Sequence, residues 1–97
     1  MNNTTEKAYK AFIQKRNRKI GNTEVRIENG ESYMYLFGNL IAKTDEGRLL
    51  INHCGWITNT TKERLSAFIT LRRSKGEFIV NERFVWEDGW LDVNDCN

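Results

Sequence analysis

The residue types that carry out catalysis are sparse in this chain of 97 residues. His53 is the only histidine, so a nucleophilic arrangement with a serine or cysteine would have to use it. Its neighbour Cys54 would point to the opposite face if both residues lie on a strand. Zinc needs four ligands, and Cys96 is distant in sequence with no Cys-x-x-Cys spacing. We therefore expect no catalytic residues, no metal and no cofactor, and we do not expect an enzyme.

A second group of polar residues gathers where a strand is expected to lead into a helix, within residues 55–65. Hydroxyl groups and free backbone N–H groups at a helix N-terminus can hold an anion. The alternative is a simple cap, in which the Thr60 hydroxyl accepts a hydrogen bond from the N–H of Glu63 and the Glu63 side chain reaches back. No phosphate-binding fingerprint accompanies the segment. The candidate anion-binding residues are Thr58, Thr60, Thr61 and Lys62.

Basic residues form two clusters, one within residues 10–19 and one within residues 72–75. Phosphate groups attract such clusters, and Tyr33 or Tyr35 could stack on bases if one face of the sheet is open. The net charge of +2 is small for a dedicated nucleic-acid-binding protein. The candidate nucleic-acid-binding residues are Lys10, Lys15, Arg16, Arg18, Lys19, Arg72, Arg73 and Lys75.

The charges are unevenly spread along the chain. Residues 1–20 carry six basic and one acidic side chain, a net charge of +5, whereas residues 81–97 carry one basic and five acidic, a net charge of −4. Two interpretations remain open. The two ends neutralise each other within the fold or across a homodimer, or the basic end contacts an anionic partner.

The acidic C-terminal part also contains tryptophans close to turns. Such a strip, together with an exposed edge strand, could dock onto a larger protein or support dimerisation through the sheet edge. The alternative is that the aromatic side chains pack in the core or at its rim. The candidate protein-contacting residues are Trp86, Asp88 and Trp90.

Two helices are expected to position these residues. Tyr9, Phe12 and Ile13 lie at i, i+3 and i+4, which predicts a helix over about residues 5–17. This helix either packs on the core or forms an arm that orders on binding, because a short helix is marginal without a packed face. The capped central helix is predicted over about residues 60–70.

The remaining chain has the pattern of short strands. Residues 23–28 alternate between apolar and polar, and Asn29-Gly30 is typical of a two-residue hairpin turn. We therefore predict an α+β fold with a single antiparallel sheet of about five to seven short strands, partly covered by the helices. The expected organisation is a basic helix or arm over residues 1–22 and an α+β core with an acidic tail over residues 23–97.

The apolar runs are only a few residues long, such as Leu49–Ile51. A membrane span or a signal peptide needs a much longer run, so neither is predicted and no membrane partner is expected. Hydrophobic residues make up 39% of the chain and charged residues 29%, which is typical of a globular protein. We expect a cytoplasmic location with Cys54 and Cys96 as separate thiols.

Two segments have distinctive patterns: Gly38–Ala42, with the pattern Gly-Asn-x-Ile-Ala, and Gly55–Leu65, with the pattern Gly-Trp-x-Thr-x-Thr-Thr-x-x-Arg-Leu. These patterns resemble those of a family of short, functionally uncharacterised bacteriophage proteins. The resemblance covers about residues 23–93. The family often places an asparagine after Arg-Leu, where this chain has Ser66. The resemblance assigns no catalytic residues.

A phage origin implies, by analogy of context, a small accessory protein that acts by binding. The expected activity is stoichiometric inhibition or modulation of a host defence or host-machinery protein in the host cytoplasm. Binding of RNA or DNA through the basic clusters is the alternative. Binding of a small anion or nucleotide at the start of the central helix is the third candidate.

Overall fold

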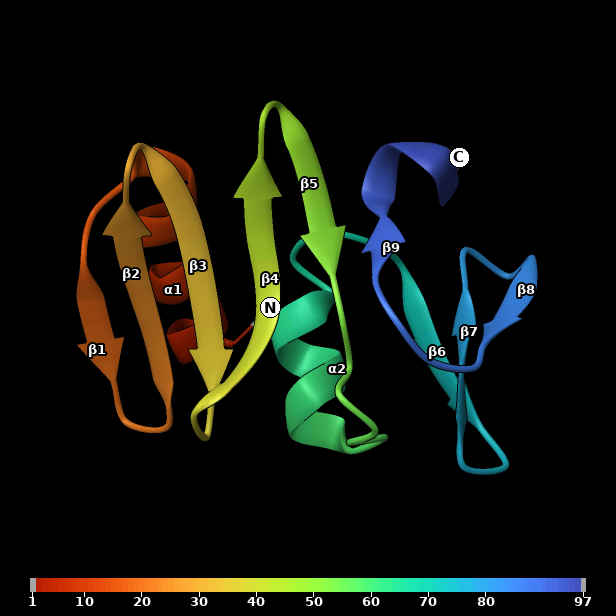
Figure 1. Ribbon diagram of the computed structural model, residues 1–97. Coiled ribbons are helices and arrows are strands. Elements are labelled where there is room, and N and C mark those ends of the chain that lie inside the picture. The colour runs from red at the N-terminus through yellow and green to blue at the C-terminus, as the bar shows by residue number, and fades with distance from the viewer. Residues whose placement is uncertain (1, 97) are drawn as a thin grey trace.

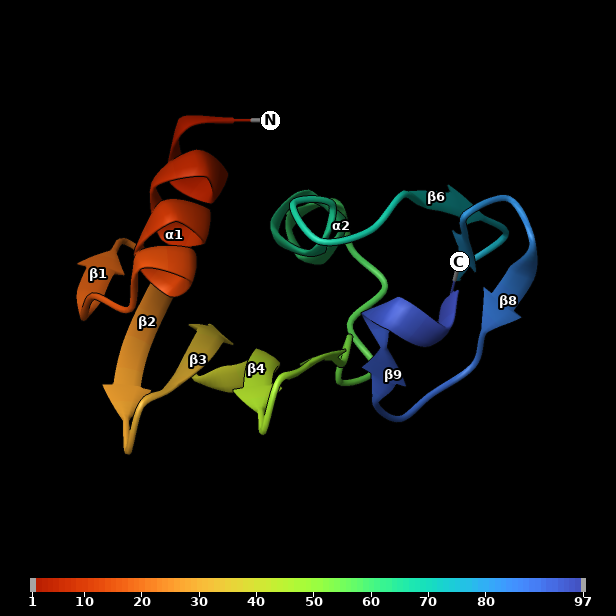
Figure 2. The same cartoon turned by 90° about the horizontal axis from the view of Figure 1, so that it is seen from above.

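The computed structural model describes residues 2–96. It contains a six-stranded antiparallel sheet in the order β1-β2-β3-β4-β5-β9 and a three-stranded sheet in the order β6-β7-β8 (Figure 1). Both helices lie on the same side of the large sheet, so its opposite face carries neither helix (Figure 2). The elements are α1 (Asn3–Gln14), β1 (Arg18–Ile20), β2 (Thr23–Glu28), β3 (Glu31–Leu36), β4 (Asn39–Asp45), β5 (Arg48–Ile51), α2 (Asn59–Leu65), β6 (Leu71–Ser74), β7 (Glu77–Val80), β8 (Phe84–Trp86), β9 (Leu91–Asp92) and the 3₁₀ helix η1 (Val93–Cys96).

The predicted α+β class is confirmed, and the large sheet has a strand number within the predicted range. The structure adds β1, which the sequence did not predict because a three-residue strand shows no alternation. It also separates β6, β7 and β8 from the large sheet. The chain leaves β5 through a loop and α2, so β6 begins away from the β5 edge, and only β9 returns to pair with it.

The N-terminal helix α1 packs against β2 and β3. Its N-cap is Asn2, whose Oδ1 accepts a hydrogen bond from the N–H of Thr5 at 2.8 Å, so the helix begins and ends slightly earlier than predicted. Ala8 and Phe12 are buried in the core. Ile13 was expected on the apolar face but is 54% exposed. The buried face of α1 is formed by Thr5, Ala8, Ala11 and Phe12, and Ile13 lies to one side of it.

The central helix α2 begins at a different cap from the predicted one. Thr58 has an extended backbone, and its Oγ1 accepts a hydrogen bond from the N–H of Thr61 at 3.2 Å. Thr60 lies inside the first turn, so its prediction as the N-cap is wrong. Thr58 and Thr61 have the same spacing as Thr60 and Glu63. Local sequence therefore could not distinguish the two possible caps. Burial of Thr61 on the core side favours Thr58 as the N-cap.

The helix α2 is also shorter than predicted, with seven residues. The hydroxyl of Ser66 donates to the Lys62 carbonyl at 2.6 Å, and the chain turns away at this point. Among residues 2–96, no helix is long and apolar enough to cross a membrane.

A hydrogen-bond network holds the turn between β4 and β5. The Glu31 carboxylate accepts from the backbone N–H of Glu46 at 2.7 Å and from the Thr44 hydroxyl at 2.8 Å. The Thr44 hydroxyl oxygen accepts from the N–H of Ser32, whose own hydroxyl donates to the carbonyl of Phe12. These bonds to the ionised form, first that from Glu46, hold the pKa of Glu31 below its ordinary value of 4.5.

This network makes stability depend on pH. A carboxyl group whose pKa is lowered by folding stabilises the fold above its unfolded pKa, and this contribution is lost as the pH falls through the folded pKa. At pH 7 we expect Glu31→Gln to melt a few degrees below the wild type, and we expect the difference to shrink below pH 4.5. Thermal unfolding of both proteins across this range tests the expectation. A difference that stays constant with pH would contradict it.

Candidate functional site

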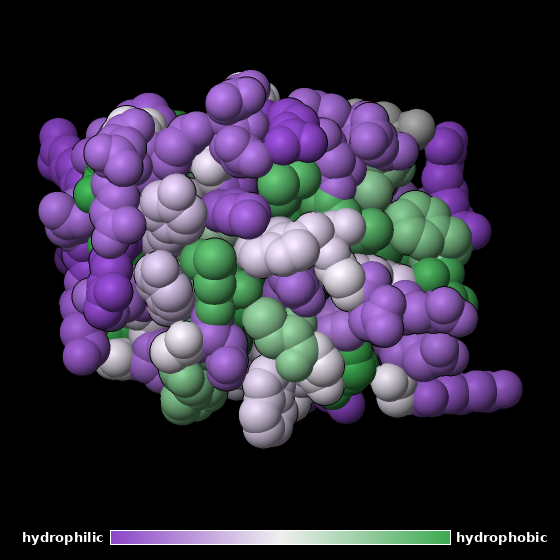
Figure 3. Space-filling model, viewed as in Figure 1, coloured by the Kyte–Doolittle hydropathy of each residue, from purple (hydrophilic) through white to green (hydrophobic). Residues whose placement is uncertain are grey.

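An open pocket of about 360 Å³ lies where the turn between β3 and β4 meets the start of α2. This region is at the lower end of the sheet in Figure 1, and hydrophobic and pale side chains reach the lower margin of the surface in Figure 3, whereas the upper margin is mostly hydrophilic. The lining is predominantly apolar. The lining residues are Leu36, Phe37, Asn39, Ile41, Trp56, Thr58, Thr60 and Thr61.

Phe37 forms one rim of this pocket and is 70% exposed. It occupies the first central position of the two-residue turn between β3 and β4, with φ of 50°, followed by Gly38 with φ of 81°. Both angles are those of a type I′ turn, in which asparagine, aspartate or glycine is preferred at this position. A left-handed conformation costs about 1–2 kcal/mol for an ordinary L-residue. Neither burial nor turn geometry therefore accounts for a phenylalanine here.

Trp56 also lines the pocket and is 57% exposed. It follows a tight turn in which Cys54 and Gly55 both have positive φ, and its N–H donates to the His53 carbonyl at 2.9 Å. His53 and Cys54 thus lie in a turn and not on a strand. Burial raises the pKa of the Cys54 thiol, which disfavours the reactive thiolate.

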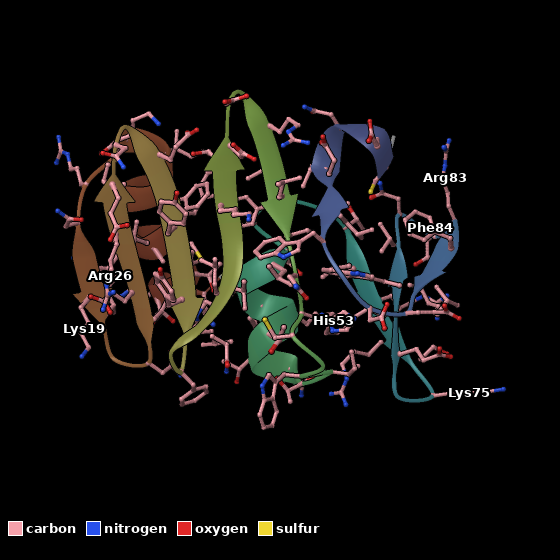
Figure 4. The ribbon with its side chains drawn as sticks, viewed as in Figure 1. Lys19, Arg26, His53, Lys75, Arg83 and Phe84 are labelled. Atoms are coloured by element: carbon pink, nitrogen blue, oxygen red, sulfur yellow. The ribbon has the colours of Figure 1, made fainter. Side chains whose placement is uncertain are left out.

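His53 holds the loop that carries Trp56. The imidazole is 2% exposed and lies between the two sheets (Figure 4). Nδ1 accepts from the N–H of Gly55 at 2.9 Å, which leaves Nε2 to donate to the carbonyl of Glu87 at 3.1 Å. The ring also packs against Trp86, with 4.5 Å between centroids. Both ring nitrogens are therefore used to position the backbone.

The residues predicted to bind an anion surround the same pocket. The Thr58 hydroxyl accepts from the N–H of Thr61 and donates to its Oγ1 at 3.0 Å, and Thr61 is buried. Thr60 lines the pocket with them, whereas Lys62 does not. The structure brings the three threonines together, but the hydroxyls of Thr58 and Thr61 already have partners, so they serve the helix cap.

The two predicted basic clusters lie at opposite ends of the molecule. Figure 4 shows Lys19 at one end and Lys75 at the other. Within the first cluster, Lys10, Arg16 and Arg18 surround a surface hollow of about 310 Å³ between α1 and β1. Lys15 donates to the Gly30 carbonyl at 2.6 Å, outside this hollow.

The second basic cluster is largely occupied by neighbouring side chains. Arg72 forms an ion pair with Glu82 at 2.8 Å, and Arg73 donates to Oδ1 of Asn59 at 2.8 Å. Lys75 stands at the tip of the turn between β6 and β7. The structure does not bring this cluster next to the first one, so the two cannot form a single continuous basic surface.

The predicted protein-contacting residues separate into two groups. Trp86 is 2% exposed, and its Nε1 donates to the Gly89 carbonyl at 3.2 Å. Strand pairing places it opposite Phe78, which is also buried. This corrects the expected surface position of Trp86. Asp88 is exposed, and Trp90 is 38% exposed with the Lys43 ammonium 4.4 Å from its ring, so both stay candidates.

Neither Phe37 nor Trp56 was among the candidate binding residues predicted from the sequence. One sequence signal could have identified Phe37. A Phe-Gly pair occupies a hairpin position where Asn-Gly is typical, as at Asn29-Gly30 in the preceding hairpin. Within the part of the chain that the structure describes, no group of three histidine, cysteine, aspartate or glutamate residues could hold a metal ion.

Comparison with known protein families gives a match to a family of phage proteins. The family model described as Kyanoviridae Gp96 protein matches residues 1–91. The match extends through the basic N-terminal segment, which the resemblance over about residues 23–93 did not include. No curated protein and no solved structure matches the chain. The chain therefore belongs to the Kyanoviridae Gp96 protein family, a family of phage proteins.

Proposed function

We propose that this phage protein acts in the host cytoplasm by binding a host protein through the pocket between Phe37 and Trp56. The observation that carries the proposal is the pair of aromatic side chains, 70% and 57% exposed, on the rims of an apolar pocket. Exposed apolar surface around a hollow is a common feature of protein-interaction sites. Tryptophan is also enriched among the residues that dominate binding energy at interfaces.

The backbone at Phe37 gives independent support. The phenylalanine stands in a left-handed conformation that another residue would adopt at lower energy. Glu46 and Lys75 have the same conformation in other turns, so what distinguishes Phe37 is a large apolar side chain that is 70% exposed at such a position. Binding of a partner side chain in the pocket would use the Phe37 ring, which contributes little to the fold at its present exposure.

The proposed mechanism is stoichiometric occlusion without turnover, directed at a host defence or host-machinery protein. Membership of a phage family supports an accessory role of this kind. The rigid loop around His53 and the capped start of α2 support a preformed site, which limits the entropy lost on binding.

Nucleic-acid binding is the second candidate. The hollow between α1 and β1, lined by Lys10, Arg16 and Arg18, could receive a phosphate group. The open sheet face carries half-buried Tyr33 and Tyr35, with the Arg26 guanidinium 5.1 Å from the Tyr35 ring. The separation of the two basic clusters and the acidic side chains between them make this candidate weaker than the first.

Phe37→Asn tests the leading proposal, because the substitution should act in opposite directions on stability and on binding. Asparagine tolerates positive φ, so we expect the variant to be more stable by about 1 kcal/mol and to melt about 5 °C higher. In affinity capture from host lysate, we expect the variant to lose a host protein that the wild type retains in stoichiometric amount.

Ile13→Ala is the matched control, since Ile13 is an exposed apolar residue on α1 and does not line the pocket. This variant should capture the same host protein as the wild type. If Phe37→Asn captures that protein equally well, the pocket is not the binding site. If all three baits instead carry nucleic acid that a high-salt wash releases, the second candidate replaces the first.

A further inference from the structure

The four edge strands of the two sheets differ in how well their sequences discourage pairing with another chain. Sheet edges usually carry charged residues, which discourage pairing with another chain. Within the described residues, three edges follow this rule: β1 contains Arg18 and Lys19, β6 contains two arginines, and β9 contains Asp92. The fourth edge strand, β8, has the sequence Phe-Val-Trp and contains no charge.

Two of the three side chains of β8 are also exposed. Phe84 is 38% exposed and Val85 is 42% exposed, although both are apolar. The strand runs along the margin of the molecule, beyond β7 (Figure 1), and Phe84 is labelled there in Figure 4. An exposed apolar edge strand is a template for pairing with another strand.

The backbone of β8 has one residue whose peptide groups face outward. The N–H of Asn81 donates to the carbonyl of Thr70, so odd-numbered residues of β7 direct their peptide groups toward β6. The N–H and carbonyl groups of the even-numbered residues of β7 therefore point toward β8. Val85 pairs with Ile79, an odd-numbered residue, so the N–H and carbonyl of Val85 point to the free edge.

The charges that flank β8 are of opposite sign at its two ends. Arg83 precedes the strand, and Glu87 and Asp88 follow it; all three are exposed. None of the ion pairs found in residues 2–96 involves them. Figure 4 shows Arg83 extending from the margin of the molecule. In an antiparallel pairing of two identical strands, the basic end of one copy lies beside the acidic end of the other.

We propose that the chain forms a homodimer in which β8 pairs antiparallel with β8 of a second copy. The two-fold axis passes through the Val85 pair, whose peptide groups exchange two hydrogen bonds. Arg83 of each copy lies beside Glu87 of the other, and Phe84 lies across from the partner's Trp86. The two small sheets become one continuous six-stranded sheet. This inference does not depend on the proposed function, because none of these residues lines the pocket.

Sedimentation velocity and light scattering test the dimer over about 1 µM to 1 mM, the range in which a small interface dissociates. We expect the wild type to shift from monomer to dimer across this range. Val85→Lys places a charge on the edge and should remain monomeric, whereas Val85→Thr keeps a β-branched residue and should still dimerise. A wild type that is monomeric throughout, or a Val85→Lys variant that still dimerises, would overturn the proposal.

A charge exchange tests the antiparallel register. Arg83→Glu or Glu87→Arg alone places like charges side by side twice in the dimer, so each should raise Kd about tenfold. The double variant R83E/E87R restores opposite charges and should return Kd to within about threefold of the wild type. Lys19→Glu, at the opposite end of the molecule from β8 in Figure 4, is the matched control and should leave Kd unchanged. A double variant weaker than both single variants would disprove this register.

Discussion

Replacing Arg64 with alanine is expected to lower the free energy of unfolding by about 3–5 kcal/mol. Arg64 is only 6% exposed, and its guanidinium joins α2 to two other elements. Nε donates to the hydroxyl of Thr23 on β2 at 2.8 Å, and Nη1 donates to the hydroxyl of Thr5 on α1 at 2.8 Å. Nη2 is 3.4 Å from Oδ1 of Asn22. Truncation removes these bonds and leaves a cavity between the helices and the sheet.

The large expected effect arises because buried donors and acceptors cannot all find new partners. Hydrogen bonds that involve a charged group contribute about 1.5–3 kcal/mol each, and the hydroxyls left behind lose their partner as well. All three acceptors are neutral, so no carboxylate accepts a hydrogen bond from the buried guanidinium. Burial accordingly lowers the pKa of Arg64, partly offset by the nearby Glu63.

Urea unfolding followed by tryptophan fluorescence measures the change, with the transition midpoint shifted and the slope unchanged. Arg64→Lys keeps the charge but cannot donate from three nitrogens, so we expect it to recover only part of the loss. Arg18→Ala, at an exposed position, is the control and should change stability by less than about 0.5 kcal/mol. If Arg64→Ala is destabilised by less than about 1 kcal/mol, Arg64 does not join the elements as described.

Replacing Trp56 with alanine should weaken binding of the captured host protein by about 30- to 100-fold, which corresponds to about 2–3 kcal/mol. The indole is 57% exposed and forms one rim of the pocket, so it is available to a partner without any change of conformation. Its loop is held by His53, which keeps the side chain in place before binding. Since Trp56 contributes little to the core, stability should change by less than about 0.5 kcal/mol.

Isothermal titration with the purified host protein measures this loss. Trp90→Ala is the matched control, because Trp90 is also a partly exposed tryptophan but contacts Lys43 away from the pocket. It should leave the affinity unchanged if the pocket is the contact surface. Equal affinities for the wild type and Trp56→Ala would exclude Trp56 from the interface. A loss with Trp90→Ala alone would instead favour the surface predicted around Asp88 and Trp90.

The structure explains most of the Gly-Trp-x-Thr-x-Thr-Thr-x-x-Arg-Leu pattern in this chain by folding alone. Thr58 caps α2, Thr61 is buried beneath it, Arg64 joins the helices, and Leu65 is fully buried. Trp56 is different, since most of its surface is exposed. The fold therefore accounts for these four side chains, whereas binding gives the simplest reason for the tryptophan.

The sequence by itself determined the local features of this protein. Alternation over residues 23–28 and the Asn29-Gly30 pair predicted the first long hairpin, and apolar spacing around Phe12 predicted α1. These features depend on backbone preferences and side-chain periodicity within a few residues, so a short window of sequence contains the necessary information.

Only the tertiary structure decided which similar residues are buried and which are exposed. Trp56, Trp86 and Trp90 all follow or precede short polar segments in the sequence, yet only Trp86 is buried, because strand pairing places it opposite Phe78. Contacts within the folded chain likewise determine which residue caps α2 and how the strands divide into two sheets. Burial depends on contacts between distant residues, such as that between Arg64 and Thr5, which are 59 positions apart. Local periodicity carries no information about such contacts, and for that reason the candidate site became visible only in the folded chain.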